Sequence, residues 1–297
     1  MRLKNARALV LVGVLTLLWG SSWPLVPLIV REIPVWTFRA IATTGAGVIL
    51  LGAARVRGQQ LAIPREHWLT VGASAILYLA VWNVSSTYAA ILIPSGQAAV
   101  LSYTMPFWAA LLSWAVLGER PGGRMVLAMT LAAAAVTLLM LPNFGVYAEA
   151  PLGLALGLLA GLGWAVGTLI LKHRAPAVPA TVLTGWQLLI AGVPISIGAL
   201  LLGDGSGHVP SWQSVALLAY VVLVPMAVGN MCWFAIVGLL PASVAGVSSI
   251  LMPVVALVSG AIVHGEPLGA VQWLAMACCA AALSLALMER ASTGRSG

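Results

Sequence analysis

The sequence predicts an all-α integral membrane protein in which ten transmembrane helices form two five-helix repeats of inverted topology. The first observation is composition: 61% of the 297 residues are apolar, 7% are charged, and the mean hydropathy is +1.05. A water-soluble domain of this length does not combine so much apolar sequence with so little charge. The other two observations are a series of apolar stretches of membrane-spanning length and a segment that occurs twice.

Each predicted span is an apolar stretch flanked by short loops, and these loops hold most of the charged residues. A helix needs about 20 mostly apolar residues to cross the hydrocarbon core of a bilayer. The N-terminal stretch has the basic flank of a signal peptide, but its apolar run continues past Trp19 without a small-residue cleavage site, so it is predicted to be the first span. The ten predicted spans are 7–30, 34–54, 66–90, 93–117, 122–141, 151–171, 179–202, 212–237, 241–263 and 267–288.

The segment that occurs twice runs over residues 94–119 and again over 241–266, with a constant offset of 241 − 94 = 147. Extending the alignment to residues 83–141 and 230–288 gives 20 identities in 59 positions. An internal repeat of this kind defines the architecture of the chain. We therefore predict a first unit at 1–145, a second unit at 151–290 and a tail at 291–297.

Charge placement predicts the orientation of the spans. If the N-terminus is cytoplasmic, twelve of the 14 Lys and Arg residues lie on that side and only Arg31 and Arg39 lie toward the other. Both termini and the tail are then cytoplasmic. Because five spans is an odd number, the second repeat is inverted relative to the first, an arrangement typical of secondary transporters.

Several function classes are excluded by the same composition. The net charge of +7 is spread through short loops, which indicates the cytoplasmic face of a membrane protein and not a nucleic-acid surface. The three cysteines, Cys232, Cys278 and Cys279, have no metal-ligand partners at a suitable spacing, so neither a metal site nor a cofactor is expected. No Asp, Glu or His lies in the middle of a predicted span, since all of them fall at span ends or in loops, so we expect neither a buried proton relay nor an enzyme.

Two prolines at matching positions of the repeat, Pro106 and Pro253, fall in the middle of the fourth and ninth spans. A proline inside a helix leaves the carbonyl four residues back without its donor, here the carbonyls of Ser102 and Ser249. One interpretation is a kink with close helix packing. The other is that both serines line a pathway and both prolines act as hinges.

Aromatic and amide side chains supply the remaining candidates. Trp19 and Trp164 occupy similar places in the two repeats, Tyr78 and Tyr103 lie near the centres of spans three and four, and Asn230 is matched by Asn83. Packing and interhelical hydrogen bonding explain each of them individually. Together, wide aromatic rings facing small residues favour a binding site for a flat or bulky solute. Trp186 in span seven is a further candidate of this type.

Two other features have simpler interpretations. The glycines of span six, Gly153, Gly157 and Gly161, are spaced four residues apart and predict a helix-packing face. Arg39 lies five residues past Pro34, where its side chain either extends to the outer interface or meets a carboxylate of the substrate. The sequence leaves these two interpretations of Arg39 open.

The doubled pattern, with its mid-span prolines, the Gly-Glu pairs that close spans four and nine, and the motif WGSSW in span one, resembles the drug/metabolite transporter superfamily. The resemblance is to its EamA-type ten-helix members and covers almost the whole chain. It implies a multi-pass protein of the bacterial inner membrane that transports a small molecule through a cavity lined by spans one, three, four, six, eight and nine. The residues that it places on those walls are Trp19, Tyr78, Ser102, Tyr103, Trp164, Asn230 and Ser249, whereas Trp186 lies outside them.

The resemblance and the residues together predict the transported solute. Small four-helix relatives carry a glutamate in the first helix for cationic drugs, and this chain has none there. We therefore expect facilitated export of neutral or zwitterionic metabolites, amino acids including aromatic ones, by a monomer or homodimer in the lipid bilayer. A proton-coupled multidrug or nucleotide-sugar transporter on the same scaffold is the alternative.

Overall fold

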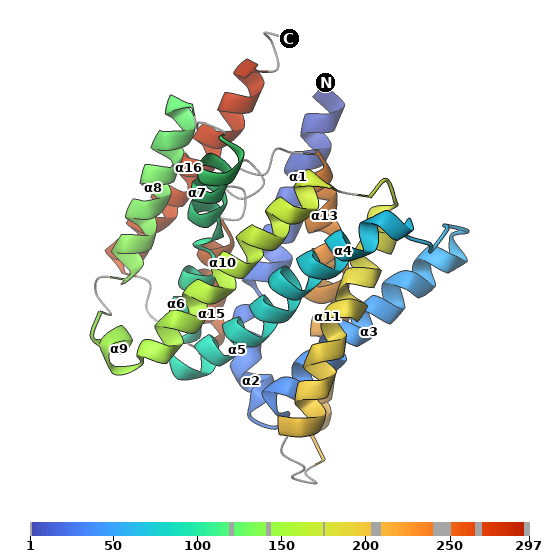
Figure 1. The fold of residues 1–297 in the computed structure, drawn as a ribbon. Helices are drawn as coiled ribbons and strands as arrows, with labels where there is room; N and C mark the ends of the chain where they lie inside the picture. Colours follow the sequence, from blue (N-terminus) through green and yellow to red (C-terminus); the bar gives the residue numbers. More distant parts are fainter. Residues whose placement is uncertain are drawn as a thin grey trace.

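The computed structural model describes residues 2–118, 122–140, 144–174, 176–202, 209–239, 251–264 and 269–293, and in these ranges it is a bundle of helices without β-strands (Figure 1). The helices of the first half are α1 (Arg2–Gly20), η1 (Trp23–Leu25), α2 (Val26–Val30), α3 (Val35–Val56), η2 (Arg65–His67), α4 (Trp68–Ala75), η3 (Ile76–Ala80), α5 (Val81–Leu92), α6 (Ser95–Ser102), α7 (Met105–Leu117) and α8 (Gly123–Met140). Those of the second half are α9 (Phe144–Glu149), α10 (Pro151–His173), α11 (Ala180–Leu202), α12 (Trp212–Val221), η5 (Val222–Gly229), α13 (Asn230–Leu239), α15 (Met252–His264) and α16 (Ala270–Thr293).

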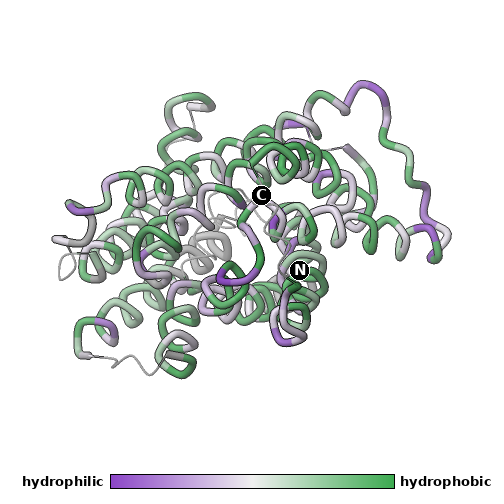
Figure 2. Tube along the Cα trace, turned by 90° about the horizontal axis from the view of Figure 1, so that it is seen from below, coloured by the Kyte–Doolittle hydropathy of each residue, from purple (hydrophilic) through white to green (hydrophobic). Residues whose placement is uncertain are grey.

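Seven helical segments within the described residues are long and apolar enough to cross a membrane. They are Val10–Val30, Val35–Val56, Arg65–Leu92, Gln97–Val116, Pro151–His173, Ala180–Leu202 and Trp212–Leu239. Three shorter apolar helices, Gly123–Leu138, Met252–Val263 and Ala270–Ala282, fall within the predicted fifth, ninth and tenth spans. Figure 2 shows apolar residues along most of the helices, with hydrophilic stretches that are short. The all-helical prediction is confirmed for the described residues, and the count of ten spans stays a prediction.

Within the described residues, spans one, three, four and eight are not uniform α-helices, and the irregularities of spans three and eight occur at matching positions of the repeat. η3 and η5 are π-helical, and adding the offset of 147 to Ile76 gives residue 223, inside η5. Span four is divided into α6 and α7 at Tyr103 and Thr104. Segments of π-helix are rare and are frequent at functional sites.

Pro106 therefore does not kink a continuous helix, in contrast to the sequence interpretation. It lies in the first turn of α7, where a proline fits because the first N–H groups of a helix have no partner within it. The ninth span repeats this geometry, since α15 begins at Met252 and places Pro253 in its first turn. The two helix starts, Met105 and Met252, are again 147 residues apart.

The packing of the helices follows the correspondence between the two halves. α3 packs on α11 and α8 on α16, which pairs spans two and seven, and spans five and ten. α10 packs on α5, α6 and α7 in the same way as α1 packs on α13 and α15. The beginning of α1 and the end of α16 lie at the same end of the bundle (Figure 1).

Glycines allow these helices to approach each other closely. A Cβ atom on Gly157 would lie 2.7 Å from the Cβ of Leu101, and one on Gly161 would lie 3.0 Å from the carbonyl oxygen of Ser102. Gly153 meets Ile93 in the same way, at 2.9 Å. The prediction that these three glycines of span six form a packing face is confirmed. Among them, Gly161 lies against the break between α6 and α7.

We expect Gly163→Ala to destabilise the fold, because the added Cβ would lie 2.6 Å from the carbonyl oxygen of Leu77 in η3. Overpacking of this kind lowers the free energy of unfolding by about 1–3 kcal/mol. The matched control is Gly13→Ala in α1, where a Cβ meets nothing within 4 Å, so the better helix propensity of alanine should leave stability unchanged or raise it by up to about 1 kcal/mol. The measurement is the apparent melting temperature of the purified protein in detergent. Equal melting temperatures for both variants would contradict the close contact of α10 with η3.

Candidate functional site

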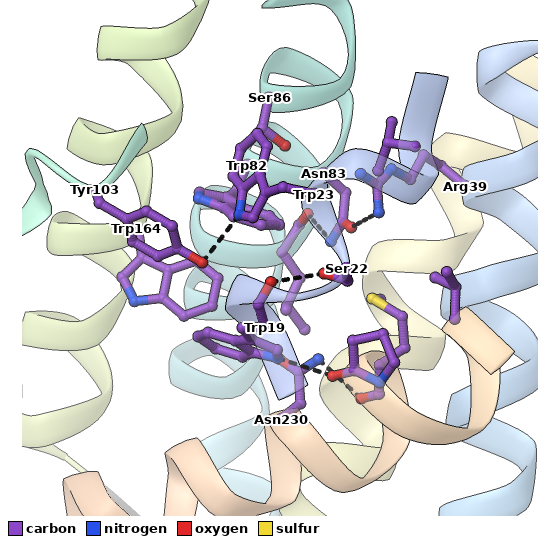
Figure 3. Close-up of a pocket in the computed structure, with 15 residues that line it drawn as sticks. Trp19, Ser22, Trp23, Arg39, Trp82, Asn83, Ser86, Tyr103, Trp164 and Asn230 are labelled. Carbon is purple, nitrogen blue, oxygen red and sulfur yellow. Dashed lines mark hydrogen bonds between the residues drawn. The ribbon is translucent and has the colours of Figure 1, made fainter. Parts of the chain in front are cut away.

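A cavity lies where helices of both halves meet, and its walls are mainly aromatic and apolar with a few polar groups (Figure 3). The lining residues are Trp19, Ser22, Trp23, Val26, Arg39, Leu79, Trp82, Asn83, Ser86, Tyr103, Trp164, Val221, Pro225, Met226 and Asn230. The volume open to the centres of water-sized molecules is about 40 Å³. Since one water needs about 10–15 Å³ by this measure, the cavity has room for a few waters and is too small for an amino acid.

The wall of the cavity is built from single faces of helices. Leu79, Trp82, Asn83 and Ser86 follow the spacing i, i+3, i+4, i+7, which places them on one side of the η3–α5 segment. In the first span, Trp19, Ser22, Trp23 and Val26 follow the same spacing. Each wall therefore presents indole rings and short polar side chains to the same space.

Trp164 is at the centre of the aromatic cluster. Its ring centroid lies 5.1 Å from those of Trp19 and Trp82, 5.5 Å from that of Trp233 and 4.4 Å from that of Tyr78. Most of these contacts are edge-to-face, an arrangement that aromatic quadrupoles favour. Trp19 and Trp164, which the sequence predicts to occupy similar places in the two repeats, are therefore in direct contact across the two halves.

Trp19 also satisfies the backbone of η5. Its Nε1–H donates to the carbonyl oxygen of Pro225 at 2.8 Å. The contact requires a glycine at position 229, because a Cβ on Gly229 would lie 2.3 Å from Trp19 Nε1. The irregular segment that lines the cavity is thereby held by a side chain from the other half.

Arg39 projects into this cavity from α3, and its side chain is only 6% exposed. Its Nε–H donates to Thr87 Oγ1 at 2.5 Å and an N–H of Nη1 donates to Asn83 Oδ1 at 3.0 Å. Its Cζ lies 4.6 Å from the centre of the Phe38 ring. The interpretation that Arg39 extends to the outer interface is therefore wrong, because Asn83 and Thr87 on α5 hold the guanidinium inside the bundle.

Asn83 and Asn230 make the same hydrogen bond in the two halves. The Nδ2 of Asn83 donates to the carbonyl oxygen of Leu79 at 2.8 Å, and that of Asn230 donates to Met226 at 2.8 Å. Their Oδ1 atoms differ, since Asn83 accepts from Arg39 whereas Asn230 Oδ1 has no partner among the described residues. Trp164 Nε1 and Ser86 Oγ on the cavity wall are unpartnered within the same residues. A bound solute can therefore meet both donors and acceptors there.

Of the residues that the sequence predicts for the site, four line the cavity: Trp19, Tyr103, Trp164 and Asn230. Tyr78 lies behind Trp164, fully buried against that indole and against Phe234. Ser102 is also fully buried at the end of α6, but it is not on the cavity wall. Ser249 lies outside the described residues.

Trp186 is placed elsewhere. Its Nε1–H donates to the carbonyl oxygen of Leu61 in the connection between α3 and α4 at 2.8 Å, and its ring packs edge-to-face on Trp68 at 5.1 Å. This indole anchors a loop and does not reach the cavity. Pro253, in contrast, lines a second, smaller cavity together with Tyr103, so α15 contacts the break in span four.

Four lining residues that carry an indole or a hydroxyl group were not singled out as candidates from the sequence: Ser22, Trp23, Trp82 and Ser86. Each of them lies three or four residues from a recognised residue: Ser22 and Trp23 from Trp19, Trp82 from Tyr78, and Ser86 from Asn83. Extending the helical face around those residues would have identified them. The sequence gave no such indication for Pro225, because this residue lines the cavity from η5, whose π-helical form the sequence does not reveal.

Comparison with known proteins gives a consistent result. The pattern of the EamA-like transporter family matches the chain twice, over residues 6–141 and 151–288. The "Uncharacterized transporter YvbV" of Bacillus subtilis is 26% identical over 267 residues, which cover 90% of this chain and 87% of that protein. The "Uncharacterized inner membrane transporter YedA" of Escherichia coli K12 is 26% identical over 264 residues, covering 88% and 84%.

Two further matches bear on function and on fold respectively. The "Probable amino-acid metabolite efflux pump" of Escherichia coli K12 is 28% identical over 191 residues, which cover 61% of this chain and 63% of that protein. A crystal structure with 20% sequence identity shares the fold with a TM-score of 0.77, over 94% of this chain and 96% of the other. The chain is thus similar to multi-pass membrane transporters over nearly its whole length.

We expect Thr87→Val to destabilise the protein, because it removes the acceptor of the Arg39 Nε–H while it keeps the shape of the side chain. Leaving a buried charged donor without its acceptor costs about 1–3 kcal/mol or more. The matched control is Thr130→Val, since Thr130 is exposed and its hydroxyl bonds only the carbonyl of Val126 in its own helix. Thermal unfolding in detergent should separate the two variants by several degrees. An unchanged midpoint for Thr87→Val would show that this hydrogen bond contributes little to stability.

Proposed function

Because the chain belongs to the EamA-like transporter family, we propose that it exports small neutral or zwitterionic metabolites, amino acids including aromatic ones, across the bacterial inner membrane. The observation on which this proposal rests is the cavity itself. Its walls combine indole rings, an arginine, two asparagines and serine hydroxyls, and they come from both halves of the chain. Such a wall suits a solute with an apolar body and a small polar end.

Two relatives support the class of substrate and the location. One relative bears the name of an amino-acid metabolite efflux pump, and another bears the name of an inner membrane transporter. Both names fit a chain with no Asp, Glu or His among the described lining residues. Transport, and not catalysis, is the activity for which such a wall is suited, because it offers no general base or nucleophile with a base beside it.

Alternating access between two inverted five-helix repeats explains the pairing of the helices. The contacts of α1 with α13 and α15 match those of α10 with α5, α6 and α7. The site lies between the repeats, as in other transporters with inverted repeats. Because the cavity of about 40 Å³ is too small for an amino acid, binding requires the two halves to move apart.

The irregular segments are the places where such a movement costs least. η3 and η5 lack the regular hydrogen bonding of an α-helix, and the break before Met105 interrupts span four. Bending at these points preserves the packed helices on either side, as in hinge motions of other proteins. Pro106 and Pro253 fix the start of the helix beyond each hinge.

Exchange of labelled L-phenylalanine in proteoliposomes tests this proposal. With unlabelled substrate inside and no pH, sodium or electrical gradient, we expect uptake of label above that of protein-free liposomes, because the described lining residues include no coupling carboxylate. Flux that requires an imposed ion gradient would rule out facilitated transport. Expulsion of cationic dyes on addition of a proton gradient, without amino-acid exchange, would instead establish the multidrug alternative.

We expect the double variant Pro106→Ala, Pro253→Ala to lower the exchange rate while the protein still inserts and folds. Alanine permits the two helices to extend backward by a turn, which removes the bend points, whereas both positions remain compatible with a helix. The measurement compares initial exchange rates at equal amounts of inserted protein. Pro194→Ala in α11 is the control, since Pro194 lies inside a helix away from the cavity. Normal exchange by the double variant would remove the prolines from the mechanism.

A further inference from the structure

The charge of Arg39 is not neutralised by any described residue. Its two hydrogen-bond acceptors, Thr87 and Asn83, and the Phe38 ring under its guanidinium are all uncharged, and the lining residues of the cavity include no carboxylate within the described parts of the chain. A charge in the interior of a membrane protein costs several kcal/mol unless it has a partner. A guanidinium carries five N–H donors, so donors remain after these two bonds.

A purely structural role does not explain this arrangement. Linking α3 to α5 through Thr87 and Asn83 requires N–H donors but no positive charge, and a neutral glutamine supplies such donors without the cost of a buried ion. The guanidinium is the side chain that binds a carboxylate through two parallel hydrogen bonds. The hydrogen bonds to the two neutral acceptors orient the guanidinium, and Arg39 is one of the lining residues of the cavity.

The arginine also breaks the correspondence between the two halves. Arg39 lies five residues after Pro34, and the equivalent position, five residues after Pro179, is Thr184. Thr184 is fully buried, and its hydroxyl has no partner among the described residues. Asn230, the counterpart of Asn83, correspondingly lacks the donor that Asn83 has. The cavity therefore has one positive side and one neutral side.

We propose that Arg39 binds the carboxylate of the transported solute, so that a carboxylate is the feature by which this cavity selects its substrate. This inference rests on the proposed function and specifies its substrate: an organic acid or amino acid with an apolar or aromatic body. In Figure 3, Arg39 lies on one side of the cavity, and Trp164 and Tyr103 lie on the other. The carboxylate is bound toward α3 and the apolar body is bound among the indoles of Trp19, Trp82 and Trp164.

The amide oxygen of Asn230 completes this assignment for an amino acid. Its amide nitrogen donates to the carbonyl of Met226, so the amide is oriented with Oδ1 as the free acceptor. An ammonium group provides donors and needs acceptors. Asn230 Oδ1 on the neutral side is suited to this group, while Arg39 takes the carboxylate.

Three probes that differ only in their charged groups test the role of Arg39. They are L-phenylalanine, its amide, which lacks the carboxylate, and 3-phenylpropionate, which lacks the ammonium. Binding to the protein in detergent is measured by ligand-dependent thermal stabilisation, which requires no transport. For the unaltered protein we expect both carboxylates to bind more tightly than the amide. Equal affinities for the carboxylates and the amide would overturn the proposal without the use of any variant.

Variants separate recognition from a structural effect. Arg39→Gln should lower the affinity for both carboxylates about 10- to 100-fold, the effect of a hydrogen bond to a charged group, and should leave the amide nearly unaffected. A merely structural role would weaken all three probes alike and would overturn the proposal. Arg39→Lys, which keeps the charge but not the planar fork, should fall between the two. Arg31→Gln is the matched control, because Arg31 is an exposed cation at the end of α2, outside the cavity.

The outcomes also distinguish this inference from the proposed function. If proteoliposomes exchange no amino acid but 3-phenylpropionate binding depends on Arg39, amino-acid export is wrong and carboxylate recognition stands. If amino-acid exchange occurs with an unchanged ratio of carboxylate to amide affinity in Arg39→Gln, the function stands and the role of Arg39 is overturned.

Discussion

The constraint on which this structure depends is that every backbone N–H and C=O within a bilayer needs a partner supplied by the protein. Helices satisfy these groups internally, and this explains why the described residues contain helices and no strands. The constraint is most informative where regular helix is interrupted. At η5, the indole of Trp19 donates to the carbonyl of Pro225. At the break in span four, the chain between Ser102 and Met105 lies directly against Gly161. Each irregularity is covered by a neighbour from the other half.

Close approach of helices follows from the same environment. Lipid tails are as apolar as leucine, so apolar side chains alone do not drive helices together, and small residues that permit close packing take over this role. The glycines of α10 allow α5, α6 and η3 to approach it closely. Bulky side chains are then concentrated where the two halves meet, in the cluster around Trp164. The result is a bundle with tight helix contacts and an aromatic centre.

Within that centre, polarity is distributed unequally. Asn83 and Asn230 make equivalent bonds to their own helices, but only Asn83 has a cationic partner. A site between two related halves becomes directional through a single substitution of this kind, with arginine at position 39 and threonine at position 184. Under the proposed function, this asymmetry would give an unsymmetrical solute one preferred orientation in an otherwise nearly symmetrical frame.

Much of the fold and part of the site follow from the sequence. Hydropathy identified the helices, and the offset of 147 residues predicted which segments correspond, from Asn83 and Asn230 to the helix starts at Met105 and Met252. The same comparison of halves singled out Trp19 and Trp164, which the fold brings into contact. These features were predictable because they depend on residue type and on position along the chain.

The direction of individual side chains was decided only by the tertiary structure. Arg39 turns into the cavity because Thr87 and Asn83 accept its N–H groups, whereas Trp186 turns to the carbonyl of Leu61 and away from the cavity. In a soluble protein the alternation of polar and apolar residues shows which face of a helix is inward. In a membrane the lipid side and the protein side are both apolar, so this signal is weak. The sequence by itself therefore determined the helices, their doubling and the candidate residue types, and the packing of one helix on another determined which of those residues share a cavity.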